Sequence, residues 1–250
     1  MKWAKRAAAG LVVILAGPLL VALAGDVKLN QDWRTADRSV VGLAPDPLLE
    51  RDAVVQIYAA RAFNWRGLFA VHTWIAAKAK DAPTFTVYQV VGWQAWWGRP
   101  VVVVTQDHPD RRWYGQRPWL LLDVRGDQAA ASLATIEQAV AEYPYRNEYT
   151  LWPGPNSNTF TAYVGRRVPA LNLHLPTTAI GKDFLPGGQL LASAPSGTGV
   201  QVSLYGVFGL TAAWYEGLEI NLLGLSMGID VRRPALKLPG VGRIGMATGI

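Results

Sequence analysis

The fold is decided by the stretch VVQIYAARAF at residues 54–63 and by the two runs that follow it, LFAVHTWIAA at 68–77 and TFTVYQVVGW at 84–93. Short runs of β-branched and aromatic residues that are bounded by Gly, Pro and charged residues are typical of strands. Connections of roughly 4–8 residues between strands favour hairpins over crossover helices. The three runs therefore predict an antiparallel sheet, which residues 100–105 and 119–124 continue.

Two helices are expected after these strands. Residues 128–143 carry apolar residues at helical spacing, with Asp127 in the capping position and Pro144 ending the helix. A tight turn at residues 152–155 (WPGP) precedes a second helix over residues 156–167. Strands followed by helices indicate an α+β fold with a mainly antiparallel sheet and two helices.

The rest of the chain suggests a division into parts. We expect residues 54–168 to form the core and residues 26–53 to be a tether in front of it. Residues 169–250 are rich in Gly and Pro and are expected to form a β-rich extension packed on the core. Its strand-like runs are residues 199–207, 210–215 and 218–225.

The N-terminus has the pattern of a signal peptide or of a membrane anchor. Residues 1–6 (MKWAKR) carry three positive charges, and residues 7–25 (AAAGLVVILAGPLLVALAG) carry no charge. A helix of that length spans a hydrocarbon core of roughly 30 Å, and a basic flank before it places the N-terminus in the cytoplasm. The small residues at 22–24 (ALA) fit a cleavage site, so cleavage and retention both stay open. In either case we expect residues 26–250 to be exported across a bacterial inner membrane and to face the periplasm.

The composition and net charge exclude several classes of site and partner. The 250 residues include no cysteine, which excludes disulfide scaffolds, thiolate metal sites and a cysteine nucleophile. The formal net charge is +6, and Lys2, Lys5 and Arg6 supply three of these charges, which leaves +3 for the remainder. Because half of the excess belongs to the N-terminal segment and no basic helix is evident, we do not expect nucleic-acid binding. We also predict no cofactor and no structural metal, since the three histidines are scattered.

Several motif matches lack the context that they need. Residues 240–245 (GVGRIG) satisfy GxGxxG, but a dinucleotide site requires a strand before this turn and a helix after it. Residues 224–228 (GLSMG) satisfy GxSxG, but all histidines precede them, so a strand end is expected. Glu216 and Glu219 would lie on opposite faces of a strand, which favours an ion pair or a solvated turn over an acid–base pair.

One candidate site combines His72 with the start of the second helix. A helix N-terminus presents unpaired N–H groups and the positive end of the helix dipole, so a nucleophile there has an oxyanion site beside it. Ser157 is the candidate nucleophile, and His72, inside a strand-like run, is the candidate base. The supporting groups would be Asn156, Asn158 and, on the following strand, Tyr88 or Gln89. The alternative is that Asn156 or Ser157 only caps the helix and that His72 is a packed strand residue.

This order of elements resembles the circularly permuted papain-like proteins, namely the lecithin:retinol acyltransferase and permuted NlpC-type groups. Their helix opens with a motif of the type Asn-Cys-Glu-His-Phe, onto which Asn156, Ser157 and Phe160 align, while His72 aligns with their catalytic His. The resemblance covers about residues 54–168 and implies a papain-like core that acts on an amide or ester. Because Ser replaces Cys, His72 would have to lie within hydrogen-bond reach of Ser157.

The amino-acid sequence also resembles the bacterial family catalogued as domain of unknown function 3750. The stretches that carry this resemblance are WPGPNSNTF at residues 152–160, LPTTAIGKDF at 175–184, EGLEINLLG at 216–224 and KLPGVGRIG at 237–245. It implies a Gram-negative bacterial source and no particular activity.

A tryptophan-rich stretch at residues 92–98 (GWQAWWG) is a candidate aromatic surface. Trp93, Trp96 and Trp97 could line a groove for a glycan or an acyl chain, or lie at a membrane interface. The alternative is an aromatic cluster that covers one end of the sheet.

Two functions therefore stay open. The first is an envelope hydrolase or acyltransferase in which Ser157 attacks and His72 acts as the base, which requires their side chains within roughly 4 Å of each other. The second is a catalytically silent binding or structural protein of the envelope with the same fold. Its partners would be an envelope lipid, peptide or glycan, and the membrane itself if residues 7–25 are retained.

Overall fold

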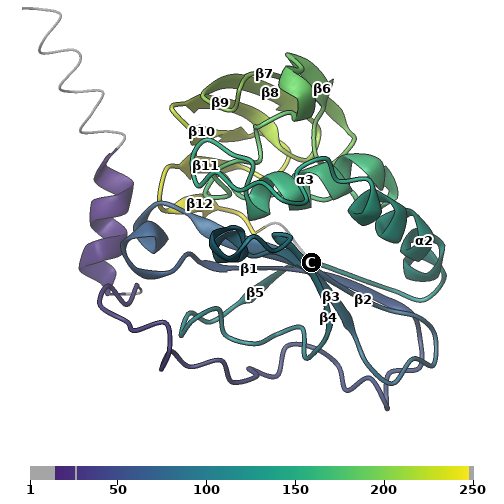
Figure 1. The fold of residues 1–250 in the computed structure, drawn as a ribbon. Coiled ribbons are helices and arrows are strands. Elements are labelled where there is room, and N and C mark those ends of the chain that lie inside the picture. The colour runs from purple at the N-terminus through teal and green to yellow at the C-terminus, as the bar shows by residue number, and fades with distance from the viewer. Residues whose placement is uncertain (1–14, 26, 248–250) are drawn as a thin grey trace, which may run out of the picture.

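Two antiparallel sheets and the helices α2 and α3 make up the main body of the fold. The computed structural model describes residues 15–25 and 27–247, and Figure 1 shows the path of the chain. The predicted α+β class with mainly antiparallel strands is confirmed. The first sheet has five strands in the order β4-β3-β2-β1-β5. These strands are β1 Val54–Arg61, β2 Val71–Lys78, β3 Thr86–Val90, β4 Val102–Gln106 and β5 Trp119–Arg125.

The helices α2 (Asp127–Ala141) and α3 (Ser157–Arg167) lie on one face of the first sheet. Helix α2 contacts β1 and β5, and α3 contacts β2 and β3. The expected capping role of Asp127 is wrong, because Asp127 is the first helical residue and Gly126 is the N-cap, with φ of 68°. Glycine adopts such an angle without strain, so the chain enters the helix one residue earlier than the side-chain pattern indicated. The short 3-10 helices are η1 Asn64–Leu68, η2 Gly92–Trp97, η3 Pro169–Leu171 and η4 Pro186–Gly188.

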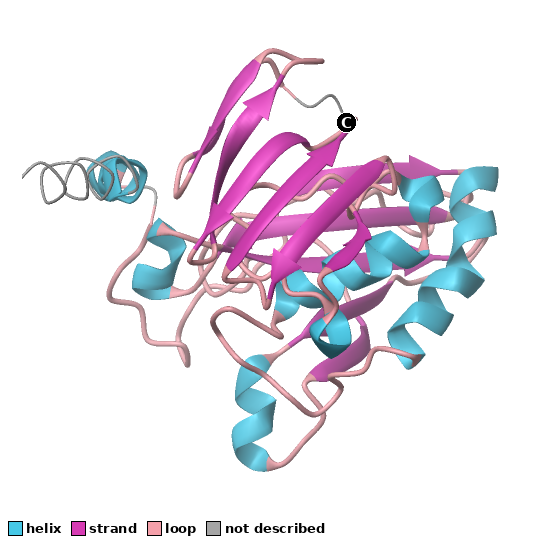
Figure 2. Cartoon of the chain, turned by 90° about the horizontal axis from the view of Figure 1, so that it is seen from above, coloured by secondary structure: helices cyan, strands magenta, loops and turns pink. Residues whose placement is uncertain are grey.

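The C-terminal part forms a second sheet of seven strands, which Figure 2 shows from above. Its strands follow chain order from β6 to β12, each antiparallel to the next. They are β6 Leu191–Ser193, β7 Gly199–Leu204, β8 Phe208–Ala213, β9 Gly217–Leu222, β10 Leu225–Asp230, β11 Ala235–Leu238 and β12 Gly242–Gly245. Both rejected motifs lie at strands of this sheet, since residues 224–228 run into β10 and residues 240–245 run into β12.

The first sheet separates two apolar cores. On the helix side, Ile57, Ala59 and Ile75 pack with residues of α2 and α3. On the other side, Tyr58, Ala60 and Trp74 form a second cluster. Successive strand residues point to opposite faces. Along β1 and β2 the side chains therefore alternate between the core on the helix side and the cluster on the other side.

The second sheet has the reverse of the usual polarity. Its side chains that face α3 and the loop between α3 and β6 are polar and buried. The side chains on the other side of the sheet are apolar and exposed. The buried set consists of Gln201, Ser203, Thr211, Glu219, Asn221, Ser226, Asp230 and Lys237. Antiparallel sheets that cover a core normally turn their apolar face inward, so this sheet is joined to the rest of the molecule by hydrogen bonds and ion pairs.

The N-terminal segment lies against the second sheet as far as it is described. Residues 15–24 are helical, and Pro18 lies beside Gly240 in the turn between β11 and β12. None of the helices within residues 15–25 and 27–247 combines the length and the apolar character that a membrane span requires. Most of the predicted signal or anchor, residues 1–14, lies outside the described residues.

Residues 27–53, expected to be a tether, follow the surface of the first sheet. The backbone N–H of Gln31 donates to Asn64 Oδ1 at 3.0 Å, and that of Leu43 donates to the buried Asp110 carboxylate at 2.6 Å. Leu43 also packs against the apolar cluster on the side of the sheet away from the helices. The segment is therefore bound to the core along its length.

Candidate functional site

His72 lies on the side of the first sheet that faces away from the helices. Its ring stacks on Trp113 with centroids 3.5 Å apart and on Trp74 at 5.7 Å. It pairs across the strands with Ala60, which belongs to the cluster on that side. Burial lowers the pKa of His72 to about 3, so the ring is neutral at physiological pH.

Ser157 lies on the opposite side of the same sheet. The next residue of β2, Thr73, is close to α3, and its hydroxyl bonds to Asn158 Oδ1 at 2.9 Å and lies 3.4 Å from the Ser157 carbonyl. Thr73 pairs with Ala59, which belongs to the core on the helix side. Since His72 and Thr73 are neighbours in one strand, their side chains leave it in opposite directions.

The structure therefore does not bring His72 and Ser157 together, and the predicted catalytic pair is wrong. The sheet itself lies between the imidazole and the first turn of α3. Of the two groups considered for orienting His72, Gln89 contacts it, with Nε2 and Oε1 3.5 Å apart. Tyr88 points into the core on the helix side, so its expected supporting role is also wrong.

The first turn of α3 is a structural junction. The Asn156 side chain accepts from the N–H groups of Asn158 and Thr159, and Thr159 Oγ1 in turn accepts from the Asn156 N–H, which completes a capping box. Asn156 Nδ2 donates to the carbonyls of Leu151 and Ile180, both at 3.1 Å. The expected cap at Asn156 is confirmed, and its side chain is committed to holding the helix.

Asn158 and Thr159 extend this junction to the strand and to the loop after α3. Asn158 Nδ2 donates to Val71 O at 2.9 Å and to Ile180 O at 2.8 Å, and Thr159 Oγ1 donates to Gly181 O at 2.8 Å. Gly181 has φ of 101°, and a Cβ built on it would lie 2.4 Å from the Asn156 amide. A glycine is required there on both counts, since the left-handed backbone and the close approach each disfavour a side chain.

The three tryptophans of residues 92–98 do not act as one surface. Trp93 packs on Trp113 at 5.8 Å and meets Tyr114 edge to face at 5.2 Å, so it extends the stack that holds His72. Trp96 and Trp97 are exposed, Trp96 to 86%. Trp96 and Trp97 are therefore much more accessible to a partner than the half-buried Trp93.

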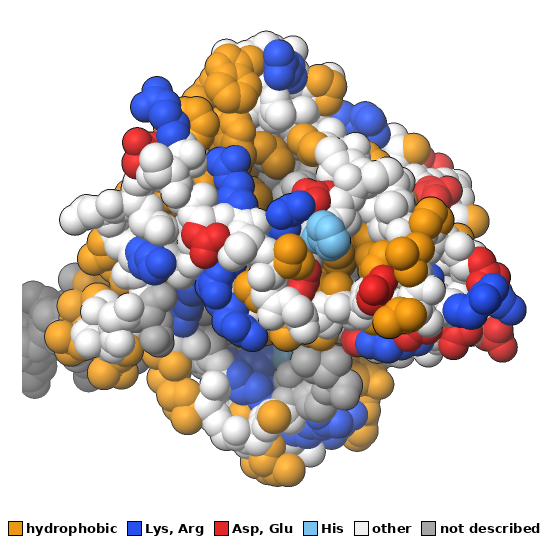
Figure 3. Space-filling model, turned by 90° about the horizontal axis from the view of Figure 1, so that it is seen from below, with side chains coloured by type: hydrophobic (Ala, Val, Ile, Leu, Met, Phe, Trp, Pro, Cys, Tyr) orange, Lys and Arg blue, Asp and Glu red, His pale blue; other side chains and the backbone are white. Residues whose placement is uncertain are grey.

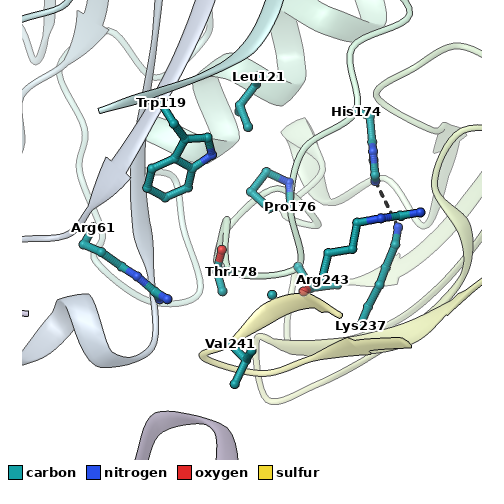
Figure 4. A pocket seen from close by; sticks show the side chains of 11 residues that line it. Arg61, Trp119, Leu121, His174, Pro176, Thr178, Lys237, Val241 and Arg243 are labelled. Carbon is teal, nitrogen blue, oxygen red and sulfur yellow. Dashed lines mark hydrogen bonds between the residues drawn. The ribbon is translucent and has the colours of Figure 1, made fainter. Parts of the chain in front are cut away.

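A cavity of about 220 Å³ lies between the two sheets. Figure 4 shows Arg61 and Trp119 of the first sheet on one side, and Lys237 and Arg243 of the second sheet on the other. The loop after α3 closes it with His174 and with residues 176–178. Among the described residues that line this cavity, none is Asp or Glu.

The basic side chains around the cavity are held in fixed positions. Arg61 donates to Gly240 O at 2.6 Å, which connects β1 to the turn before β12. Lys237 Nζ bonds to Glu219 Oε1 at 2.7 Å and to Glu216 O at 2.6 Å. Arg243 bonds to Asp230 at 2.8 Å. On the face seen in Figure 3, by comparison, basic and acidic side chains are interspersed.

His174 is a neutral acceptor in this arrangement. Its Nε2 lies 2.9 Å from Lys237 Nζ, and an ammonium group can only donate. The ring proton therefore resides on Nδ1. Burial, and then the charge of Lys237, lowers the pKa of His174 to about 3, which agrees with this tautomer.

Thr177 is one of the residues that line the cavity. Its side chain is buried, and its Oγ1 has no hydrogen-bond partner in the described part of the protein. A buried hydroxyl without a partner costs about 1–3 kcal/mol.

The sequence pattern did not identify these cavity residues. Seven of the eleven lie in the stretches 175–184 and 237–245, which stood out in the sequence only through the family resemblance. The signal that could have found them is the unusual placing of Lys237 and Arg243 within short strand-like runs, where charges require buried partners. Glu216 and Glu219 follow the same rule, because both are buried and Glu219 forms the expected ion pair.

The matching family model covers residues 52–184 and is described as "Protein of unknown function (DUF3750)". The chain belongs to this family. The matched range contains the first sheet, both α-helices and the loop that closes the cavity, and it ends before β6. No curated protein and no solved structure matches the chain.

Proposed function

We propose that this member of the DUF3750 family is a catalytically silent envelope protein that binds a small anionic group, such as a phosphate or carboxylate, between its two sheets. The observation that carries the proposal is a cavity lined by Arg61, Lys237 and Arg243, with no Asp or Glu among the described residues of its lining. Anionic oxygens accept hydrogen bonds from hydroxyl and basic groups, and such charge-assisted bonds are the strong ones.

The arrangement of charge favours an anion over a cation in this cavity. The carboxylates of Glu219 and Asp230 are paired with Lys237 and Arg243, and neither of these acidic residues lines the cavity. Arg61 enters from the first sheet. A bound anion would therefore meet positive groups from both sheets.

The papain-like resemblance is proposed to be architectural only. What supports it is a His-bearing strand, β2, that precedes a helix, α3, whose N-cap is Asn156. The chemistry does not follow, because the imidazole and Ser157 lie on opposite sides of the sheet. A fluorophosphonate probe should leave Ser157 unlabelled. Labelling that disappears in Ser157→Ala would instead restore the hydrolase or acyltransferase proposal.

Export is proposed from the N-terminal pattern. The basic residues 1–6 and the apolar residues 7–25 would carry the chain into or across the inner membrane, leaving residues 26–250 in the periplasm. A C-terminal alkaline phosphatase fusion, which is active only in the periplasm, tests the orientation. An inactive fusion on a stably produced protein would contradict export.

Anion binding is tested by calorimetric titration of the full chain with inorganic phosphate and with acetate. Arg61→Gln removes one of the positive charges that line the cavity, so binding should weaken about tenfold. Arg99→Gln makes the same change at an exposed position outside the cavity and should leave binding unchanged. Absence of saturable binding to either anion, or equal binding by both variants, would contradict the proposal.

A further inference from the structure

The outer face of the second sheet is a continuous apolar surface. Registered pairs place Val200, Ala212, Leu218, Ile229, Leu236 and Ile244 in one row from β7 to β12. A parallel row joins Leu191, Val202, Leu210, Ile220 and Met227, and a third joins Leu204, Phe208, Leu222 and Leu225. These three rows, which we call the outer rows, contain no charged residue.

The outer rows are too extensive for an ordinary exposed surface. Seven strands spaced about 4.8 Å apart give a width of about 29 Å, and the three alternate positions on each of the four strands β7 to β10 span about 14 Å along the strand. A contiguous apolar area of more than a few hundred Å² on a monomer usually marks an interaction site. Most of the side chains in these rows are exposed in the structure.

The part of the chain that the structure describes does not supply the cover. The opposite face of the sheet is committed to α3 and its loop through buried polar contacts. Arg166 of α3 bonds to Gln201, and Asn221 and Ser226 each bond to Asp183 Oδ2 at 3.0 Å. A sheet that keeps its polar side chains inside and its apolar side chains outside has the polarity expected against lipid. This polarity is the reverse of that expected against water.

Two features on the borders of the sheet indicate a bilayer as the occupant. Beside the β11–β12 turn, the helical residues 15–24 expose Leu19, Leu20 and Leu23, so the apolar surface continues into the segment predicted to enter the membrane. At the opposite ends of the strands, Trp214 is exposed and the Arg232 guanidinium lies 4.5 Å from the ring centroid of Tyr215. Aromatic and basic side chains together are typical of the membrane–water interface.

We propose that the outer rows dock on the surface of a lipid bilayer, beside the entry point of the N-terminal segment. The apolar side chains would lie at the level of the acyl chains nearest the headgroups, and Trp214, Tyr215 and Arg232 would lie among the headgroups. The face is broad, which suits a membrane surface better than a single extended peptide. This docking is independent of anion binding in the cavity.

The absence of cysteine from the chain allows a direct test. Val202→Cys places a single thiol in the central row, and Val104→Cys places one on β4 of the first sheet. The two valines are matched controls, with exposed fractions of 48% and 49%. Each full-length variant is labelled with an environment-sensitive fluorophore and mixed with vesicles of phosphatidylcholine and phosphatidylglycerol that carry a nitroxide-labelled lipid.

Quenching by the nitroxide lipid decides between the outcomes, because the N-terminal segment attaches both variants alike. We expect at least threefold stronger quenching at position 202 than at position 104. Adding Ile220→Lys to the Val202→Cys variant should reduce the quenching to the level seen at position 104. Circular dichroism checks that this outward-facing change leaves the fold intact.

Equal quenching at the two positions, or none at either, would overturn the docking proposal. A second copy of the chain is the other possible occupant. In that case the label at position 202 would become buried as the protein concentration rises without lipid, and nitroxide lipid would not quench it. Because phosphate titration needs no vesicles, the failure of membrane docking and the failure of anion binding are distinguishable.

Discussion

Glu219 provides the most quantitative test of how the second sheet is attached. Its carboxylate bridges two ammonium groups, those of Lys182 and Lys237, and all three side chains are 2% exposed or less. Burial alone would raise the pKa of Glu219, but the charges of the two lysines outweigh burial and hold it at about 2. Glu219→Gln keeps the shape of the side chain and leaves two buried cations without their counter-ion.

Two estimates of the loss of unfolding free energy in Glu219→Gln agree. Breaking a buried ion pair by removing one partner costs about 3–5 kcal/mol. The difference between the ordinary pKa of 4.5 and a value of about 2, at about 1.36 kcal/mol per pH unit, corresponds to about 3 kcal/mol. We therefore expect Glu219→Gln to lower the free energy of unfolding by about 3–4 kcal/mol at neutral pH.

The assay is urea unfolding of the full chain in mild detergent, followed by tryptophan fluorescence. Glu142→Gln is the matched control, because Glu142 pairs with Arg167 on the surface and its loss should have little effect. Since the folded-state pKa of Glu219 is depressed, its contribution is complete above pH 4.5 and is lost as the pH falls toward 2. The difference between wild type and Glu219→Gln should therefore shrink over that range.

A destabilisation below about 1 kcal/mol at neutral pH would refute the ion-pair account of this interface. A large destabilisation that stays constant from pH 5 to pH 2.5 would refute the electrostatic origin and indicate a packing effect.

Three further predictions test the local assignments. Asn156→Ala should lower the free energy of unfolding by about 1–2 kcal/mol because it removes the cap of α3, whereas Ser157→Ala should change it much less. Urea titration compares the two variants. Equal losses of unfolding free energy would contradict the capping assignment. Burial holds the pKa of His72 at about 3, below its ordinary 6.5, so the unfolded chain binds a proton that the folded chain lacks and stability falls as the pH drops from 6.5 toward 3. His72→Phe should flatten the pH dependence of the melting temperature in that window, and a profile parallel to that of the wild type would show that the ring is not buried in its neutral form. Trp93→Ala should cost about 3 kcal/mol of unfolding free energy, because the ring packs on Trp113, while Trp96→Ala should be nearly neutral; similar melting temperatures for these two variants would contradict the packing.

Much of the first sheet could be predicted from local pattern. The runs at 54–63, 68–77 and 84–93 became β1, β2 and β3, because β-branched and aromatic residues between turn residues suit a pleated, buried surface whatever they pack against. The opening of α3 at Asn156 was likewise predictable, since capping is a contact within four residues.

The candidate site was misplaced for a reason that local pattern does not reveal. His72 and Thr73 are adjacent, and the choice of which one faces α3 depends on the register of β2 against β1 and on the side that the helices cover. A shift of one residue exchanges the two faces of a strand. The sequence spacing of His72 and Ser157 is compatible with either arrangement.

The second sheet shows most clearly what the sequence pattern decides and what the tertiary structure decides. In runs such as GVQVSL at Gly199–Leu204 and GLEINL at Gly217–Leu222, the alternation of apolar and polar residues by itself determines that these are strands with two unlike faces. It does not determine which face is inside, because a period of two is symmetric between the faces. The tertiary structure decides this by placing Lys182, Asp183 and Arg166 where the sheet packs, so that polar side chains find partners inside and the apolar rows remain outside.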